Sequence, residues 1–164
     1  MKNLLYFSLL FCILLAGCDV EEPVSVSKEE QQETKQETPK QTFKVKDVVK
    51  IGSRELIVKS AKLTDGDAYN RPKRGKVLEL EIQGRNLGNS PWILTEFDFN
   101  CYDQSGSKLE SYFSDEISQL GEINQGKTVS GKLFFDAPDE RVFELVYRPN
   151  AFTGQEVKFN IQLN

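Results

Sequence analysis

The sequence of 164 residues predicts an all-β domain, a two-layer antiparallel β-sandwich of seven or eight strands that follows a disordered tether. Three observations support this prediction. Short segments alternate between apolar and polar residues, clusters of turn-forming residues separate these segments, and no long apolar stripe has helical spacing. A small closed β-barrel built from the same strands is the competing fold.

Alternation with a period of two predicts the individual strands. The clearest case is residues 157–163, which are apolar at every second position. Other segments with one apolar face occupy residues 77–86, 95–102, 129–135 and 143–147, and two less regular ones lie near 43–50 and 55–63. Within 95–102 the alternation turns Phe97, Phe99 and Cys101 toward the core. We expect Cys101 to be a small apolar core residue without a disulfide partner.

Residues that favour turns lie between these strands. Asn, Asp, Gly, Pro and Ser are concentrated at residues 86–91, 103–106, 124–126 and 153–154. A helix is expected at one place only, as a short helical turn within residues 115–120.

The first 17 residues have the features of a secretory signal peptide. A short basic start precedes an apolar run over residues 4–15, which is too short to span a bilayer. The run ends in Leu-Ala-Gly followed by Cys18, which resembles the bacterial lipobox. We predict cleavage before Cys18 and acyl chains on its thiol, which place the protein on the extracytoplasmic side of the cell membrane with membrane lipid as a partner. An ordinary secretory leader with an incidental cysteine is the alternative.

A polar linker follows the lipidated cysteine, over residues 18–42. From residue 19 onward it carries seven acidic and three basic side chains, and three valines are its only apolar ones. So few apolar groups cannot offset the entropy of ordering, so we predict a disordered spacer that holds the domain of residues 43–164 away from the lipid.

The composition excludes most familiar enzyme chemistry. The chain contains no histidine, so no Ser-His-Asp or Cys-His nucleophile system and no histidine-containing zinc site can form. No glycine-rich phosphate-binding motif is present. We therefore expect no catalytic residues, no metal site and no cofactor, and a function in binding.

Three sequence blocks carry a resemblance to a known family. They are residues 82–88, residues 97–106 and, most specifically, Gly131 to Pro138 with its Gly-x-Leu-x-Phe-Asp-x-Pro pattern. This order resembles the telokin-like, immunoglobulin-like extracellular domain of lipoproteins from Gram-positive bacteria, a family of unknown function. Gln125 stands where that family often has proline. The resemblance implies an immunoglobulin-like fold and an extracytoplasmic location, but no activity.

A basic loop is the first candidate contact site. Within six residues it contains four basic side chains, those of Arg71, Lys73, Arg74 and Lys76. Residues 44–85 hold 11 basic and six acidic side chains, whereas residues 86–164 hold six and 12. The loop is suited to an anionic cell-wall polymer, a lipid headgroup or an acidic partner, and a solvated hairpin loop is the alternative. Nucleic acid is not expected, because no aromatic residues interleave with the basic run.

An outward aromatic face is the second candidate contact site. The outward phase of residues 92–102 contains Trp92, Leu94 and Tyr102. A bulge, or burial under the loop of residues 64–76, would instead make these side chains part of the core. Two acidic turns, at residues 65–70 and 136–140, lack the ordered spacing of a calcium loop, and polar turns are expected there.

These features indicate a membrane-anchored, extracytoplasmic binding or accessory module that contacts an envelope protein or a cell-wall component. The alternative is an envelope stress, spore or phage-exclusion factor that blocks a surface component. An enzyme is not expected.

Overall fold

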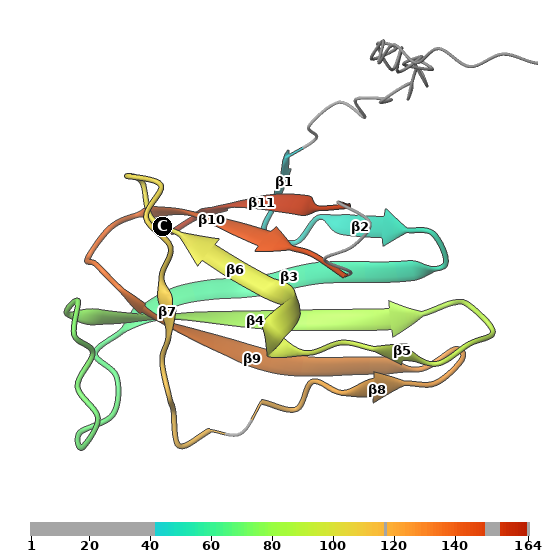
Figure 1. Cartoon of the computed structure of the whole chain (residues 1–164), viewed down its shortest axis with the longest axis horizontal. Coiled ribbons are helices and arrows are strands. Elements are labelled where there is room, and N and C mark those ends of the chain that lie inside the picture. Colours follow the sequence, from blue (N-terminus) through green and yellow to red (C-terminus); the bar gives the residue numbers. More distant parts are fainter. Residues whose placement is uncertain (1–41, 117, 150–154, 164) are drawn as a thin grey trace, which may run out of the picture. The chain divides into compact units, whose positions relative to one another are not determined.

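The computed structural model describes residues 42–116, 118–149 and 155–163 (Figure 1). The predicted signal peptide, Cys18 and all of the predicted linker before Thr42 lie outside these residues. Their cleavage, lipidation and disorder stay predictions.

The described residues form two main β-sheets (Figure 1). Sheet A has the order β1-β11-β10-β6, with β1 at Thr42–Lys44, β6 at Phe99–Tyr102, β10 at Val142–Tyr147 and β11 at Val157–Gln162. Sheet B has the order β2-β3-β4-β9-β7, with β2 at Val48–Ile51, β3 at Arg54–Thr64, β4 at Lys76–Asn86, β7 at Glu110–Ser111 and β9 at Thr128–Ala137. A separate pair joins β5 at Trp92–Ile93 to β8 at Glu122–Ile123.

This arrangement confirms the predicted β-sandwich, since the described strands form two main sheets and a separate pair and do not close into a barrel. The described residues contain eleven strands where seven or eight were expected, because several are only two to four residues long. One pairing also departs from the expected antiparallel pattern. Strand β1 runs parallel to β11, with Thr42 opposite Lys158 and Lys44 opposite Asn160.

The core lies between the sheets, where alternate side chains of facing strands meet. Strand β4 contributes Leu78, Leu80 and Ile82, each with no exposed surface. Full burial of such a side chain stabilises a fold by about 1.5–3 kcal/mol. Cys101 is also fully buried and is a free thiol, as predicted, and burial raises its pKa to about 12. It is therefore a core residue with no reactive thiolate at neutral pH.

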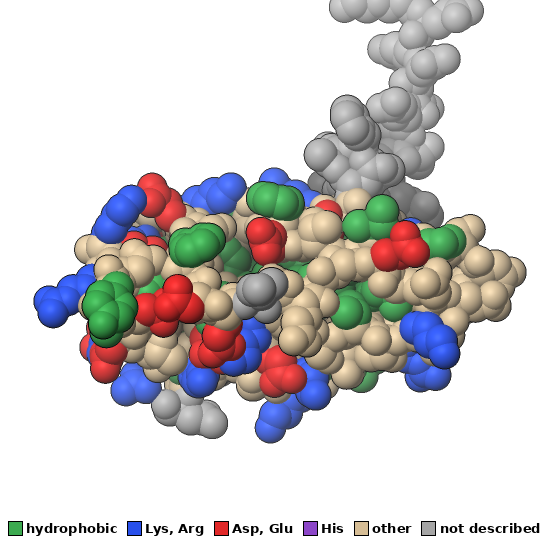
Figure 2. Space-filling view, turned by 90° about the horizontal axis from the view of Figure 1, so that it is seen from below, with side chains coloured by type: hydrophobic (Ala, Val, Ile, Leu, Met, Phe, Trp, Pro, Cys, Tyr) green, Lys and Arg blue, Asp and Glu red, His purple; other side chains and the backbone are tan. Residues whose placement is uncertain are grey.

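The outer face of sheet B carries charged side chains that pair with one another across the strands. Glu79 on β4 lies 3.0 Å from Lys62 on β3 and 3.0 Å from Lys132 on β9, and Lys132 continues to Glu116 at 2.5 Å. Figure 2 shows acidic and basic side chains interspersed over the face that it presents. Because Lys62, Glu79 and Lys132 neutralise one another, this part of the outer face of sheet B has no strong electrostatic field of one sign.

The helical turn expected within residues 115–120 is wrong, since the described residues of this segment form no helix. Among the residues that the structure describes, a 3₁₀ turn, η1 at Glu96–Asp98, occurs instead between β5 and β6. In the part of the chain that the structure describes, no helix is long and apolar enough to cross a membrane.

Candidate functional site

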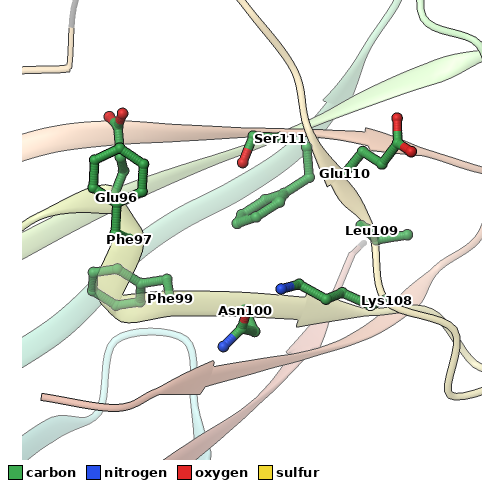
Figure 3. Close-up of a pocket in the computed structure, with 9 residues that line it drawn as sticks. Glu96, Phe97, Phe99, Asn100, Lys108, Leu109, Glu110 and Ser111 are labelled. Carbon is green, nitrogen blue, oxygen red and sulfur yellow. The ribbon is translucent and has the colours of Figure 1, made fainter. Parts of the chain in front are cut away.

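The sandwich is open at one edge, where β6 ends sheet A and β7 ends sheet B. The chain crosses from one sheet to the other here. The N–H of Leu109 donates to the Cys101 carbonyl beside β6 at 2.8 Å, and the N–H of Tyr112 donates to the Phe134 carbonyl on β9 at 2.8 Å. A groove with a volume of about 410 Å³ lies in the angle between them (Figure 3). We call this the edge groove; it is lined by Glu96, Phe97, Phe99, Asn100, Lys108, Leu109, Glu110, Ser111 and Phe135.

The edge groove combines an apolar floor with a polar rim. Phe99, Leu109 and Phe135 are almost fully buried and form the floor. Glu96 and Lys108 on the rim make no ion pair within the described residues, and Figure 3 shows them on opposite sides of the groove. Ligand sites in proteins commonly have this composition, in which apolar surface supplies affinity and a few polar groups supply orientation.

Phe97 stands at one end of the groove with 87% of its surface exposed. The 3₁₀ turn holds it there, because the Asp98 carboxylate accepts hydrogen bonds from the N–H of Thr95 at 2.8 Å and from its hydroxyl at 3.2 Å. The Asp98 carbonyl in turn accepts the N–H of Arg148 at 2.8 Å. The hydrogen-bonded turn η1 therefore places the exposed ring of Phe97 at the end of the groove.

The inward position predicted for Phe97 is wrong. Three residues form each turn of a 3₁₀ helix, so η1 interrupts the two-residue period that begins again at Phe99. The sequence does contain a signal for this turn. Thr95 and Asp98 have the spacing of a capping box, in which a polar residue caps the start of a helical turn.

The outward positions predicted for Trp92 and Leu94 are also wrong, since these side chains are 2% and 0% exposed. They pack on β4 at Gly84, where a Cβ atom would lie 2.7 Å from Leu94 and 2.9 Å from Trp92. The Arg54 guanidinium covers the Trp92 ring at 5.5 Å. A glycine on the inner face of β4 thus makes room for β5, and both side chains belong to the core.

Tyr102 remains partly at the surface, but not beside Trp92 and Leu94, which are buried. It lies half-buried in sheet A, opposite Glu144 on β10, and lines a second hollow of about 420 Å³. The charges beside it pair with one another, with Lys158 3.1 Å from Glu144 and Arg148 3.1 Å from Glu156. The structure therefore does not bring the three predicted residues into one aromatic face.

The basic loop is held against the sandwich by its own backbone. The Asp136 carboxylate, which is 6% exposed, accepts the N–H groups of Lys73 at 2.7 Å and Arg74 at 2.8 Å. The Arg74 guanidinium donates to the buried carboxylate of Asp103 at 2.6 Å. Hydrogen bonds from Ser105 and from Arg74 lower the pKa of Asp103 to about 2. We call this assembly the loop clamp.

The two lysines of the loop also have acidic partners. Lys73 lies 3.0 Å from Glu110, and Lys76 lies 2.7 Å from Asp65. Each pairing raises the pKa of the lysine. Arg71 alone among the four makes no ion pair within the described residues. Contact between this loop and an anionic partner stays a prediction, although most of its charge is neutralised locally.

The acidic turn at residues 65–70 forms hydrogen bonds within the protein, one of them from Lys76 of the basic loop to Asp65. Asp67 donates its N–H to the Tyr112 hydroxyl at 2.8 Å, and its carboxylate accepts from that hydroxyl at 3.3 Å. In the described ranges, no three His, Cys, Asp or Glu side chains gather in a way that could hold a metal ion. The carboxylates here act as acceptors for the protein's own donors.

Residues 43–157 match the family described as a domain of unknown function, DUF4352. The chain belongs to this family. This confirms the resemblance predicted from the sequence. The chain is 28% identical over 156 residues to the uncharacterised lipoprotein YcdA of Bacillus subtilis strain 168, an alignment that covers 93% of this chain and 40% of that protein. The chain thus spans less than half the length of this curated relative.

Solved structures show the same fold. The crystal structure of YcdA has a TM-score of 0.61 at 23% identity, covering 70% of this chain and 38% of that one. YjhA of Bacillus subtilis has a TM-score of 0.58 at 18% identity, covering 75% and 100%. The secreted protein MPT63 of Mycobacterium tuberculosis has a TM-score of 0.55 at 16% identity, covering 74% and 96%. At these identities the likeness establishes the fold alone.

Proposed function

We propose that this protein is a lipid-anchored, extracytoplasmic binding module that contacts another envelope component through the edge groove. The observation that carries the proposal is the exposed ring of Phe97, on a hydrogen-bonded turn beside an apolar floor, with the unpaired charges of Glu96 and Lys108 on the rim. Binding surfaces concentrate their affinity in a few aromatic anchors of this kind, next to pockets that exclude water.

Phe97 differs from the other exposed aromatic side chains in its surroundings. Phe113 is 83% exposed and Tyr69 is fully exposed, yet neither lines the edge groove. Scattered exposed apolar side chains are normal on protein surfaces and need no functional explanation. An exposed aromatic ring at the mouth of an apolar groove does offer a partner both a contact and a place to insert a side chain.

The membrane anchor is proposed from the sequence and from the relative. Cys18 follows small residues at the end of an apolar leader, and YcdA is itself described as a lipoprotein. Two or three acyl chains hold a protein on a bilayer far more firmly than one. We expect a Cys18→Ala variant to leave the membrane fraction and to appear in the medium or the soluble extracytoplasmic fraction. Retention of that variant with the membrane, to the same extent as the wild type, would contradict the anchor.

Binding is proposed in preference to catalysis because the groove lacks a catalytic arrangement. The chain has no histidine, and the polar groups of the groove are two glutamates, one lysine, one asparagine and one serine. No hydrogen bond within the groove joins Ser111 to a base that would activate it. These groups are suited to orient a partner.

Site-specific cross-linking in living cells tests the groove as the contact site. A photoreactive amino acid replaces Phe97 in one strain and Phe113 in a matched control strain, since both positions are exposed to a similar extent. We expect position 97 to capture a defined envelope component that position 113 does not capture. Identical capture patterns, or no capture from position 97, would contradict the proposal. A captured stress or phage-entry component would favour the blocking function over the accessory one.

A further inference from the structure

The sandwich is also open at its opposite edge, where β1 ends sheet A and β2 ends sheet B. The chain passes from one sheet to the other here, between Lys44 and Val48. Among the described residues, β2 pairs with β3 on one side and with no strand on the other. We call this free side of residues 48–51 the β2 edge.

Two hydrogen bonds show which residues of β3 turn their main chains toward β2. In an antiparallel pair, the N–H and C=O of one residue point to the same side, and successive residues alternate between the two sides. The Ser53 carbonyl accepts the N–H of Leu87 and so faces β4, and the main chain of the next residue, Arg54, therefore faces β2. The Val58 carbonyl also faces β2, because it accepts the N–H of Lys46 at 2.7 Å. Both observations turn the main chains of the even-numbered residues from 54 to 58 toward β2.

This register turns the main chains of Val48 and Lys50 away from β3. Ile51 lies opposite Arg54, so its N–H and C=O groups face β3, and those of Val49 do the same. The N–H and C=O groups of Val48 and Lys50 lie on the β2 edge, where they have no hydrogen-bond partner within the described residues. Both residues are at the surface, with Val48 53% exposed and the Lys50 side chain 74% exposed. The β2 edge therefore offers two donors and two acceptors that another chain can reach.

Lysine side chains give the β2 edge a positive charge. Lys44, Lys46 and Lys50 lie within seven residues, among which Asp47 is the one acidic residue. Neither Lys44 nor Lys46 makes an ion pair within the described residues, and Lys50 reaches Glu55 only at 3.9 Å. The same charges on a second copy would repel these, and lysine on an edge strand opposes pairing of this kind. The β2 edge is therefore suited to an acidic strand and not to another copy of itself.

Apolar side chains beside the β2 edge are only partly covered. Ile51 on β2, Val45 between the two sheets and Phe43 on β1 are each half-buried and pack against the core. Side chains alternate along β2, with Val49 buried on the inner face and Lys50 exposed on the outer face. A strand added beside β2 places its own side chains alternately on these two faces. Its inward side chains would bury more of this apolar surface.

We propose that the β2 edge binds an extended, acidic segment of a partner protein, which adds to sheet B as a further strand. Strand addition to a free sheet edge is a general mode of peptide recognition. The segment alternates acidic residues, which lie beside Lys50 on the outer face, with apolar residues, which face inward. An anionic wall polymer would meet the lysines but lacks regularly spaced amide groups for the main chains of Val48 and Lys50. The β2 edge is separate from the edge groove, so this inference goes beyond the proposed function.

Selection from a displayed library of random short peptides tests this inference on the full-length chain in detergent. The library is counter-selected against a Lys50→Glu variant, which reverses a charge on the β2 edge and leaves the main chain unchanged. We expect the wild type to enrich peptides that alternate acidic and apolar residues. The Lys50→Glu variant should instead enrich peptides with a basic residue at the position beside residue 50.

Two variants at position 48 separate main-chain pairing from side-chain contact. Val48→Pro removes an N–H that faces away from β3, whereas Val48→Ala keeps this N–H and removes most of the side chain. Val48→Pro should weaken the binding of an enriched peptide about tenfold, and Val48→Ala should weaken it less than about threefold. Urea denaturation of both variants checks that they are folded.

Methylation of single main-chain nitrogens of an enriched peptide gives the same readout on the unaltered protein, should Val48→Pro fail to fold. Methylation of a nitrogen that bonds to the Val48 or Lys50 carbonyl should weaken binding about tenfold. Methylation of the next nitrogen along the peptide, which faces away from β2, should have little effect.

Amide hydrogen exchange locates the contact on the protein. The amides of Val48 and Lys50 should exchange fast in the free protein and more slowly when an enriched peptide is bound. The Val49 amide, which faces β3, should change little and serves as the control. Slow exchange of Val48 and Lys50 in the free protein would overturn the inference, because another part of the chain or a second copy would then already occupy the β2 edge.

Three further results would overturn strand addition. They are the absence of any peptide enriched by the wild type over Lys50→Glu, equal binding of an enriched peptide to folded Val48→Pro and Val48→Ala, and affinity that is insensitive to methylation at every peptide nitrogen. Binding that falls in Lys50→Glu but not in Val48→Pro would show that the lysine side chains alone hold an anionic ligand. Capture from position 97 in the edge groove is independent of all these results, so the two proposals fail separately.

Discussion

The loop clamp and the edge groove are neighbouring regions that contain the same kinds of side chain, yet they differ in how those side chains are satisfied. In the loop clamp, Asp136 and Asp103 accept hydrogen bonds from Lys73 and Arg74 while nearly buried. In the edge groove, the side chains of Glu96 and Lys108 on the rim make no ion pair within the described residues. The comparison separates charges that stabilise the fold from charges that remain available to a partner.

The pair between Lys73 and Glu110 marks the boundary between the two regions. Glu110 lines the groove, and its carboxylate is 3.0 Å from the Lys73 amine of the loop. Both side chains are largely exposed, and exposed pairs contribute little to stability. The stability of the loop therefore rests on the buried carboxylates, and variants of the two regions should have opposite effects on folding and on binding.

Removal of the carboxylate at the centre of the loop clamp should have the largest effect. In an Asp136→Ala variant, the N–H groups of Lys73 and Arg74 lose the acceptor they share. We expect the free energy of unfolding to fall by about 3 kcal/mol, because each hydrogen bond to a charged acceptor contributes about 1.5–3 kcal/mol. Urea denaturation measures this change.

Asp139 supplies the matched control for this prediction, since it is exposed and lies three residues along the same chain. An Asp139→Ala variant should change the unfolding free energy by no more than about 0.5 kcal/mol. Equal losses in the two variants would show that general charge balance, and not the buried clamp, holds the loop.

Much of the fold could be predicted from the sequence, because one face of each long strand is buried. The alternation in β4 and β11 records that burial directly, and the free, buried state of Cys101 follows from its phase. The number of strands could not be predicted in the same way. Strands of two residues, such as β5 and β7, are too short to show any period.

The candidate site was harder to predict because it lies where the alternation stops. The 3₁₀ turn interrupts the alternation, so that Phe97 is exposed where burial was expected, and Trp92 and Leu94 are buried where exposure was expected. A single residue type, the glycine at position 84, decides the burial of the latter two. The charge of the basic loop could not be judged from its own residues, since the carboxylates that pair with Arg74 and Lys73 lie 29 and 37 residues away in the sequence, at Asp103 and Glu110.

Acid should have the second-largest effect, by lowering the stability that the loop clamp contributes. The pKa of Asp103 is about 2 in the folded protein, below its ordinary value of 3.8, because Ser105 and Arg74 donate hydrogen bonds to the ionised form. The stabilisation is therefore complete above about pH 4 and is lost as the pH falls toward about 2, where the folded state also binds the proton. We expect the unfolding free energy of the wild type to fall over this interval.

An Asp103→Asn variant isolates this contribution. All other carboxyl groups remain, so the difference between the two proteins reports Asp103 alone. The variant should be less stable than the wild type at neutral pH, and the difference should shrink as the pH falls toward about 2. Urea denaturation at a series of pH values gives both curves. A difference that stays constant across the series would contradict the role assigned to the Asp103 charge.

Replacement of the exposed aromatic ring in the edge groove should have the smallest effect on folding. A Phe97→Ser variant removes a side chain that is 87% exposed, so its unfolding free energy should stay within about 0.5 kcal/mol of the wild type. Phe99→Ser, two residues along the chain, removes a ring that is buried against Tyr147 with 5.0 Å between centroids and should cost about 3–5 kcal/mol. Thermal and urea unfolding of the two variants measure this contrast.

A large loss of unfolding free energy in Phe97→Ser would mean that the ring already packs within the free protein and holds η1 in place. A loss of partner capture in that variant would then reflect impaired folding. A small loss of stability together with abolished capture would show that the Phe97 ring contacts the partner. A side chain that lies in water in the free protein and does not stabilise the fold can affect capture only through its contact with the partner.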